Sequence, residues 1–279
     1  MSNKNISILL PSRGRTQMLL DSIRSLIELA DDASQLQFLL GFDTDDTDSS
    51  EYFVNTIAPI LDEAGSQYIV LGFKPIGYQN LHQYLNKMGP HAVAPWWVFW
   101  NDDAVMLDQG WDTVILSHKD QFCIQAFDTH TKHPYSIFPI VPREWFELLG
   151  YLSTHQLNDA YISQIAWMLD IMVRIPIRVE HNRFDLTGNN NDPTFQNRTI
   201  FEGDPNDPRD FNHVTQRNNR IQDAFKLCKY LEERGYDMSY WRNVAAGKQD
   251  PWEKMLGSDV NNHMRRLTNA NMEFKSNQL

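Results

Sequence analysis

The stretch that decides the fold is Trp96-Trp97-Val98-Phe99-Trp100-Asn101-Asp102-Asp103-Ala104-Val105-Met106. A run of aromatic and β-branched residues leads directly into a polar segment with two adjacent carboxylates. Such a run predicts a strand buried on both faces, as in a parallel sheet. Because ligands of open α/β sheets bind beyond the carboxyl ends of the strands, Asp102 and Asp103 stand where a metal or ligand is expected. The alternative is that they lie in a solvated loop or cap a following turn.

Short apolar runs alternate with amphipathic segments through the first hundred residues. We expect strands at 6–10, 36–42, 68–73 and 96–100, separated by helices at 17–30, 52–64 and 78–88. This alternation is typical of a parallel, doubly wound α/β sheet, because each crossover helix returns the chain to a strand of the same direction. Later strands are expected at 122–127, 137–141 and 175–179, and later helices at 111–117, 143–149 and 155–171.

A change in composition marks the one predicted boundary. Residues 187–212 are rich in Asn, Asp, Pro and Gly and poor in aliphatic side chains, which indicates a flexible loop or lid. This segment separates a sheet domain, residues 1–186, from a C-terminal helical cap, residues 213–279. The first helix of the cap is expected at 216–234, and a weaker helical tail follows it.

Charge and cysteine content narrow the classes of protein to consider. The 279 residues include 25 Lys and Arg against 36 Asp and Glu, a formal net charge of −11. This negative net charge argues against a protein that binds nucleic acid through its overall charge. It does not exclude a local basic groove. Cys123 and Cys228 are too few and too distant for a disulfide scaffold or a zinc site. With no signal-peptide pattern and no apolar run of about 18 residues, we expect a cytoplasmic protein without a membrane span.

Three of the predicted strand ends carry polar side chains that should meet at one edge of the sheet. They are the segments 11–15, 43–48 and 101–103. Carboxylates beside a basic loop at such an edge suit a phosphorylated ligand with a divalent metal, because a hard cation binds through oxygen and neutralises a diphosphate leaving group. Asp103 is the candidate metal ligand, and Arg13 and Arg15 are forked donors for phosphate or base contacts.

The acidic segment after the second strand has two interpretations. Asp43 directly follows the strand and can accept hydrogen bonds from a base or a ribose. For Asp46 and Asp48 the favoured interpretation is an acidic turn that caps the next helix.

Four segments, in this order, carry a resemblance to one enzyme family. Residues 6–15 (ISILLPSRGR) look like its opening strand and P-[ST]-x-x-R loop, and residues 42–46 (FDTDD) are similar to its second-strand Asp. Residues 77–81 (GYQNL) look like a reduced Gly-x-x-x-Ala-Arg-Asn segment, and residues 99–103 (FWNDD) look like its D-x-D motif. Over residues 6–170 the chain resembles the nucleotide-diphospho-sugar transferases of the GT-A fold, especially glycosyltransferase family 2, some of whose relatives occur in bacteriophages.

The resemblance implies a GT-A type, Rossmann-like α/β fold with a mixed, mainly parallel sheet flanked by helices and followed by the helical cap. Asp103 would bind Mn²⁺ or Mg²⁺ as the acid of the D-x-D motif. Asn101 stands where the family has its first acid, which leaves the ribose contact to Asp102, and the Ala-Arg pair of the third segment is absent. The donor-binding residues implied are Pro11, Ser12, Arg13, Arg15, Asp43, Gly77, Asn80, Asn101 and Asp102.

Two further residues follow from the resemblance. Asp159 matches the carboxylate that serves inverting members as general base, because it follows Gly150 at the start of a helix. The alternative is an exposed acid on a helix face. His181 comes after the last predicted strand, where related transferases supply a histidine to the metal. A loop histidine that is hydrogen-bonded to backbone is the alternative.

The function implied is a metal-dependent hexosyl- or pentosyltransferase, inverting, that uses a nucleotide-diphosphate sugar, with a UDP-sugar favoured. A sugar-phosphate nucleotidyltransferase fits less well, because residues 11–16 lack the second glycine of its G-x-G-T-R loop. Two alternatives stay open. One is a DNA-modifying transferase that acts on hydroxymethylated bases in the host cytoplasm, as in large bacteriophages, and the other is a non-catalytic nucleotide- or glycan-binding module. The basic residues that would contact DNA are Arg198, Arg209, Arg217, Arg220, Lys226 and Lys229.

Overall fold

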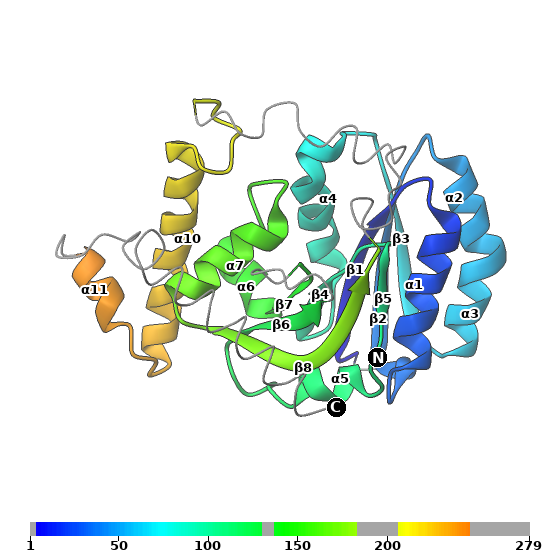
Figure 1. The fold of residues 1–279 in the computed structure, drawn as a ribbon, viewed down its shortest axis with the longest axis horizontal. Helices are drawn as coiled ribbons and strands as arrows, with labels where there is room; N and C mark the ends of the chain where they lie inside the picture. The colour runs from blue at the N-terminus through cyan, green and yellow to red at the C-terminus, as the bar shows by residue number, and fades with distance from the viewer. Residues whose placement is uncertain (1–3, 130–136, 183–205, 246–279) are drawn as a thin grey trace.

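The aromatic run forms β4, Trp96–Phe99, inside one eight-stranded sheet (Figure 1). The computed structural model describes residues 4–129, 137–182 and 206–245. The strand order is β3-β2-β1-β4-β7-β6-β8-β5. The other strands are β1 (Ile6–Ser12), β2 (Leu36–Asp43), β3 (Gln67–Phe73), β5 (Ala104–Met106), β6 (Ile124–Thr129), β7 (Pro139–Pro142) and β8 (Met172–His181).

The sheet is mixed and mainly parallel, as predicted. The four N-terminal strands are mutually parallel, and β6 is parallel to β8. β7 runs antiparallel to β4 and β6, and β5 runs antiparallel to β8. The long β8 curls across the far half of the sheet, and its carboxyl end pairs with β5 (Figure 1).

Helices cover both faces of the sheet. Helical segments of the first 91 residues are α1 (Thr16–Glu28), η1 (Ala33–Gln35), α2 (Thr47–Tyr52), η2 (Phe53–Ile57), α3 (Ala58–Glu63), η3 (Tyr78–Asn80), α4 (Leu81–Met88) and η4 (Gly89–His91). Those that follow are α5 (Trp111–Leu116), α6 (Arg143–Leu149), α7 (Asn158–Met168), α10 (Val214–Glu233) and α11 (Ser239–Ala245).

Alternation along the strands divides the apolar residues between two cores. Ile8 and Val98 pack with α1 and the segment η2–α3, whereas Leu9 and Trp97 pack with α4, α6 and α7 on the other face. Figure 1 shows α1 to α3 on one side of the sheet and α4, α7 and α10 on the other.

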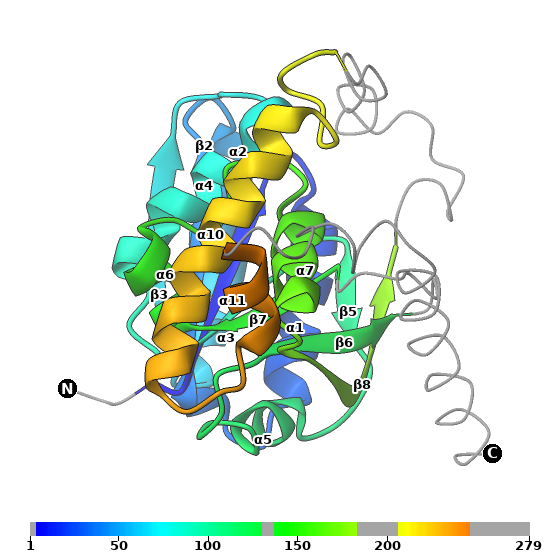
Figure 2. The same cartoon turned by 90° about the vertical axis from the view of Figure 1, so that its left-hand side faces the viewer.

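The first helix of the expected cap belongs to the second of these cores. Leu227 and Leu231 of α10 are fully buried and pack in the same cluster as Ile162 of α7. Figure 2 shows α10 running along α6 and α7. Residues 187–205 of the expected lid and 246–279 of the expected cap lie outside the described residues. Among the described helices, none combines the length and apolar character that crossing a membrane requires.

Several element boundaries differ from the expectations. The second helical segment begins at Thr47 rather than residue 52, because the Asp46 carboxylate caps it by accepting a hydrogen bond from Ser49 N. α7 begins at Asn158 rather than His155. His181 is the last residue of β8 rather than part of a following loop.

Candidate active site

The carboxyl ends of β1, β2 and β4 meet at one edge, as the parallel register requires. A tight turn over 101–104 follows β4, and it is closed by a hydrogen bond of 3.2 Å from Ala104 N to Asn101 O. Ser22 Oγ of α1 donates to the same carbonyl at 3.3 Å. The turn reverses the chain into β5, so Asp102 and Asp103 lie at the tip of a fixed reversal rather than in a solvated loop.

Asp102 is buried beneath this edge. It is 2 % exposed, and its Oδ2 accepts a hydrogen bond of 2.6 Å from Ser12 Oγ at the end of β1. Arg15 Nη2 lies 3.2 Å from its other carboxylate oxygen. A buried carboxylate with a hydroxyl and a guanidinium as partners is well compensated, so Asp102 ties the β1 loop to the turn after β4.

Asp103 and His181 are brought together by the antiparallel pairing of β5 with β8. Ala104 pairs with His181 in the register, and Asn182 N donates to Asp103 O at 2.8 Å. His181 Nε2 then lies 3.2 Å from Asp103 Oδ1, and Arg15 Nη1 lies 3.2 Å from Oδ2. Burial alone would raise the pKa of Asp103, but His181 and Arg15 outweigh it and lower that pKa below its usual value.

Asp103 Oδ1 and His181 Nδ1 are buried without a hydrogen-bond partner. Adjacent ligands of an octahedral ion with bonds of about 2.1 Å are about 3 Å apart, close to the 3.2 Å that separates Asp103 Oδ1 from His181 Nε2. Within the described ranges, no three His, Cys, Asp or Glu side chains are already grouped around a metal position. A divalent ion that is shared with phosphate oxygens needs only one or two protein ligands, so Asp103 and His181 fit it.

A second polar group forms at the end of β2. Asp43 is 7 % exposed; its Oδ2 accepts from Arg13 Nη1 at 2.7 Å and its Oδ1 from the Tyr84 hydroxyl of α4 at 2.5 Å. Arg13 also pairs with Asp45, and that hydrogen bond holds the pKa of the exposed Asp45 carboxyl below its usual range. Burial, and then the bond to Asp43, raise the pKa of Tyr84 to about 12. Tyr84 therefore stays a neutral hydrogen-bond donor.

The acidic segment also shapes the basic loop. Gly14 has a positive φ of 66°, which glycine adopts without strain, and its N–H donates to Asp46 Oδ2 at 2.8 Å and to Ser49 Oγ at 3.2 Å. Asp46 thus caps α2, as predicted, and also anchors the loop that carries Arg13 and Arg15. This anchoring sends Arg13 toward Asp43 and Arg15 toward the turn after β4.

The third segment of the resemblance reaches the site through Tyr84. The Tyr84 hydroxyl accepts a hydrogen bond of 3.2 Å from Ile76 N, next to Gly77, while it donates to Asp43. Gly77 has a φ of 74° and precedes η3. Asn80 is engaged in its own turn, donating to Ile76 O at 2.8 Å and accepting from Gln83 Nε2 at 3.0 Å. Tyr84 was not singled out from the sequence, where only its place on a predicted helix was visible.

Other sequence candidates take separate places. Pro11 lies in β1 opposite Gly41 of β2. Asn101 contributes its backbone carbonyl to the turn. Asp159 lies in the first turn of α7, a helix that packs against α10, β7 and β8. Its role as a base stays a prediction, as do the donor contacts expected of the other residues.

Three of the basic residues that were considered for DNA are engaged with other groups of the chain. Arg220 is buried, donates to Phe211 O at 2.9 Å and stacks 4.0 Å from the centre of the Phe211 ring. Arg209 pairs with Asp207, and Lys226 pairs with the buried Asp223. Arg198 lies outside the described residues.

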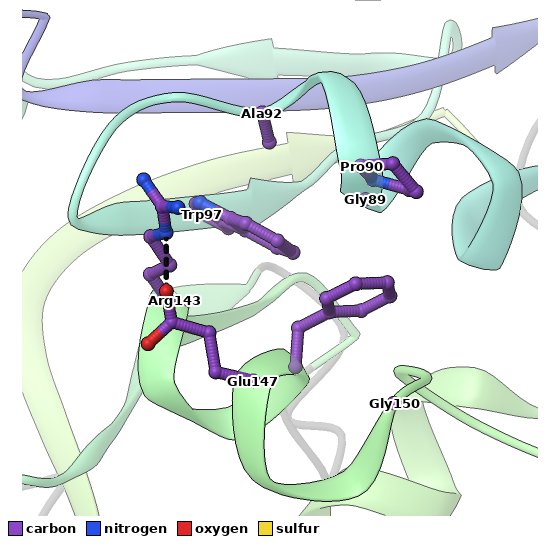
Figure 3. Close-up of a pocket in the computed structure, with 8 residues that line it drawn as sticks. Gly89, Pro90, Ala92, Trp97, Arg143, Glu147 and Gly150 are labelled. Carbon is purple, nitrogen blue, oxygen red and sulfur yellow. Dashed lines mark hydrogen bonds and ion pairs between the residues drawn. The ribbon is translucent and has the colours of Figure 1, made fainter.

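A pocket with a volume of about 340 Å³ lies away from these groups (Figure 3). The Arg143–Glu147 ion pair stands beside Trp97 in its wall, and Gly89 and Pro90 close another side. Trp97 pairs with Ser7 near the start of β1, so the pocket is at the amino end of the central strands. Ligands of such sheets bind at the other end, which excludes this pocket as the site expected from the strand ends.

Comparison with known proteins identifies the fold. No protein-family profile matches the sequence, and no curated protein matches it. The mannosyltransferase PcManGT from Pyrobaculum calidifontis, in complex with GDP-Man and Mn²⁺, superposes with a TM-score of 0.53 at 9% sequence identity. That match covers 98% of this chain and 88% of the mannosyltransferase. The predicted GT-A type fold is therefore confirmed, whereas membership of family 2 stays a prediction.

A second similar protein is S. aureus TarS. Its fragment 1–349 in complex with UDP matches with a TM-score of 0.46 at 9% identity, over 64% of this chain. The chain spans 58% of that fragment. The same fragment in complex with UDP-GlcNAc matches with a TM-score of 0.46 at 8% identity, over 64% of this chain and 56% of the fragment.

Proposed function

We propose that this chain is a metal-dependent glycosyltransferase that moves a sugar from a nucleotide-diphosphate donor to an acceptor hydroxyl. The observation that carries the proposal is the meeting of Asp103, His181 and Arg15 at the carboxyl ends of parallel strands. This edge is where an α/β sheet binds its ligand. The mannosyltransferase of the same fold binds GDP-Man and Mn²⁺, which supports a nucleotide-sugar donor and a divalent metal.

In this proposal Asp103 Oδ1 and His181 Nε2 would hold a Mn²⁺ or Mg²⁺ ion. The ion supplies positive charge that stabilises the diphosphate as it leaves. Arg15 adds a forked hydrogen-bond donor on the same side, with its terminal nitrogens 3.2 Å from the Asp102 and Asp103 carboxylates. Ser12 holds Asp102 beneath the site through Oδ2, and a ribose hydroxyl would reach Asp102 Oδ1 once Arg15 has turned to the diphosphate.

The base of the donor would lie over the end of β2. Asp43 presents an acceptor there, and Tyr84 fixes its orientation through Oδ1. Arg13 holds the other oxygen and is half exposed, so an N–H of the base can replace it at Oδ2. Both pyrimidine and guanine bases offer such a donor. We favour a UDP-sugar, and GDP-sugars are the alternative that the fold comparison adds.

For the acceptor step, we assign the role of general base to Asp159. The acceptor oxygen attacks the anomeric carbon from the face opposite the diphosphate, which inverts the configuration. Its proton passes to the Asp159 carboxylate, and the bond from the anomeric carbon to the diphosphate oxygen breaks with its electron pair leaving on the diphosphate. The transferred group is a hexose or a pentose.

A turnover assay tests this function. The chain is incubated with Mn²⁺ and a panel of UDP- and GDP-sugars, and release of nucleoside diphosphate is measured with water as a slow acceptor. We expect release with at least one donor, lost in EDTA and lowered at least about a hundredfold by Asp103→Ala.

Asp62→Ala removes an exposed carboxylate of α3 and is the matched control, which should retain full release. Absence of release and of donor binding across the panel would reject the transferase. Donor binding without any release would instead favour a non-catalytic nucleotide-binding module.

A further inference from the structure

We infer that Arg15 is an internal cation which occupies the carboxylates of the metal site until a donor binds. Before a donor binds, Arg15 and a divalent ion compete for the negative charge of the Asp102–Asp103 pair, so metal and donor bind together rather than independently. The inference rests on the proposed function, since it concerns the metal site assigned there. It adds a regulatory role for a residue that otherwise would only contact phosphate.

The geometry of the guanidinium carries this inference. One terminal nitrogen of Arg15 lies 3.2 Å from Asp102 Oδ1, and the other lies 3.2 Å from Asp103 Oδ2. The side chain is only 22 % exposed, so it spans two adjacent carboxylates inside the site rather than on its surface. A dication at Asp103 Oδ1 would share the Asp103 carboxylate with this guanidinium, so the two cations would repel each other at short range.

Electrostatics explain why a cation is required there at all times. Asp102 and Asp103 are neighbours in sequence, and both are largely withdrawn from water. Two buried carboxylates without a counter-ion repel each other strongly, and the penalty for burying an unpaired charge is several kcal/mol. Arg15 supplies the compensating charge.

Arg15 does not satisfy all the polar atoms of the proposed metal site. Asp103 Oδ1 is buried and accepts no hydrogen bond, although His181 Nε2 is 3.2 Å away, and His181 Nδ1 has no partner either. Arg15 therefore neutralises the charge without using the atoms that suit a metal. A bound diphosphate would give Arg15 another anion to pair with and would supply oxygen ligands for the ion, so the ion could replace Arg15 as the counter-charge of the carboxylates.

Binding of Mn²⁺ without nucleotide tests the inference directly. Electron paramagnetic resonance measures free Mn²⁺ in titrations of the wild-type chain and of Arg15→Gln. We expect Arg15→Gln to bind Mn²⁺ at least about tenfold more tightly, because its two carboxylates lack a counter-ion. Arg143→Gln removes the same charge from the Arg143–Glu147 pair beside Trp97 and should bind like wild type.

The wild-type chain offers a second readout that needs no variant. Mn²⁺ alone should leave its melting temperature unchanged, whereas Mn²⁺ with UDP or GDP should raise it. Equal Mn²⁺ affinity of wild type and Arg15→Gln, or a rise in wild-type melting temperature with Mn²⁺ alone, would overturn the inference.

The same titrations separate the inference from the proposed function. In one outcome, neither UDP nor GDP strengthens Mn²⁺ binding, but Arg15→Gln still binds Mn²⁺ more tightly than wild type. The competition between Arg15 and the metal is then supported, and the nucleotide-sugar donor is rejected. In the other outcome, nucleotide strengthens Mn²⁺ binding to wild type, but Arg15→Gln binds Mn²⁺ alone no more tightly than wild type. The nucleotide donor is then supported, and the competition between Arg15 and the metal is rejected.

Discussion

At the scale of single residues, Tyr84 links three parts of the candidate site. Its hydroxyl donates to Asp43 and accepts from Ile76 N. It therefore connects the carboxylate at the end of β2 with the loop before Gly77. The sequence indicated Asp43 and Arg13 from their places at strand ends, and Gly77 from the family resemblance. The sequence did not indicate a role for Tyr84, because a tyrosine on an amphipathic helix is normally interpreted as a core residue.

Tyr84→Phe should weaken nucleotide binding. The variant removes one hydrogen bond to a charged acceptor, worth about 1.5–3 kcal/mol, and leaves Asp43 held by Arg13 alone. We expect affinity for the nucleoside diphosphate to fall about tenfold in calorimetric titrations with Mn²⁺, with a reduced preference between UDP and GDP. Tyr52→Phe, which alters an exposed hydroxyl near Gln17, is the control. An unchanged affinity and preference in Tyr84→Phe would remove Tyr84 from base recognition.

At the scale of elements, the pairing of β5 with β8 is what places the candidate metal ligands. The sequence predicted a strand at 175–179 and a polar turn at 101–103 but did not show that they pair. β5 has only three residues, and its existence depends on a partner that lies some seventy residues later in the chain. Local propensity cannot reveal such a pairing, whereas the long apolar runs of β1 and β2 were visible directly.

The start of α7 depends on a neutral histidine. His155 is 2 % exposed; its Nδ1 accepts from Leu157 N at 3.1 Å and its Nε2 lies 2.8 Å from Arg209 O. This arrangement joins the entry of α7 to the segment before α10. Burial lowers the pKa of His155 to about 4, and the nearby Arg220 adds to the effect. The protonated form is therefore disfavoured in the folded chain.

The stability of the chain should consequently fall as the pH drops. Between about pH 6.5 and pH 4 the unfolded chain binds a proton at His155 and the folded chain does not, so the free energy of unfolding decreases in that window. We expect His155 to contribute a loss of about 2 kcal/mol between pH 7 and pH 5. Urea unfolding of wild type and His155→Gln at both pH values measures it. Equal pH dependence in the two proteins would contradict the assignment.

At the scale of the whole molecule, the sheet separates two cores and leaves its carboxyl edge for polar chemistry. The α/β class, the parallel N-terminal strands and the meeting of three strand ends followed from sequence, because alternation and crossover rules determine them. The reversed β5 and β7 did not follow, since they come from the later part of the chain, where strands pair out of order. The packing of α10 against α7 was also not visible, because it depends on the tertiary fold.

The central claim is that a donor diphosphate and a divalent ion bind at Asp103 and His181. A crystal structure of the chain with Mn²⁺ and UDP or GDP, with anomalous scattering recorded at the manganese edge, tests it most directly. We expect one anomalous peak within coordination distance of Asp103 Oδ1 and His181 Nε2, in contact with the diphosphate, with the base over Asp43 and Arg15 moved from the carboxylates to phosphate oxygens. A nucleotide bound elsewhere, such as in the pocket beside Trp97, or manganese away from Asp103, would contradict the account.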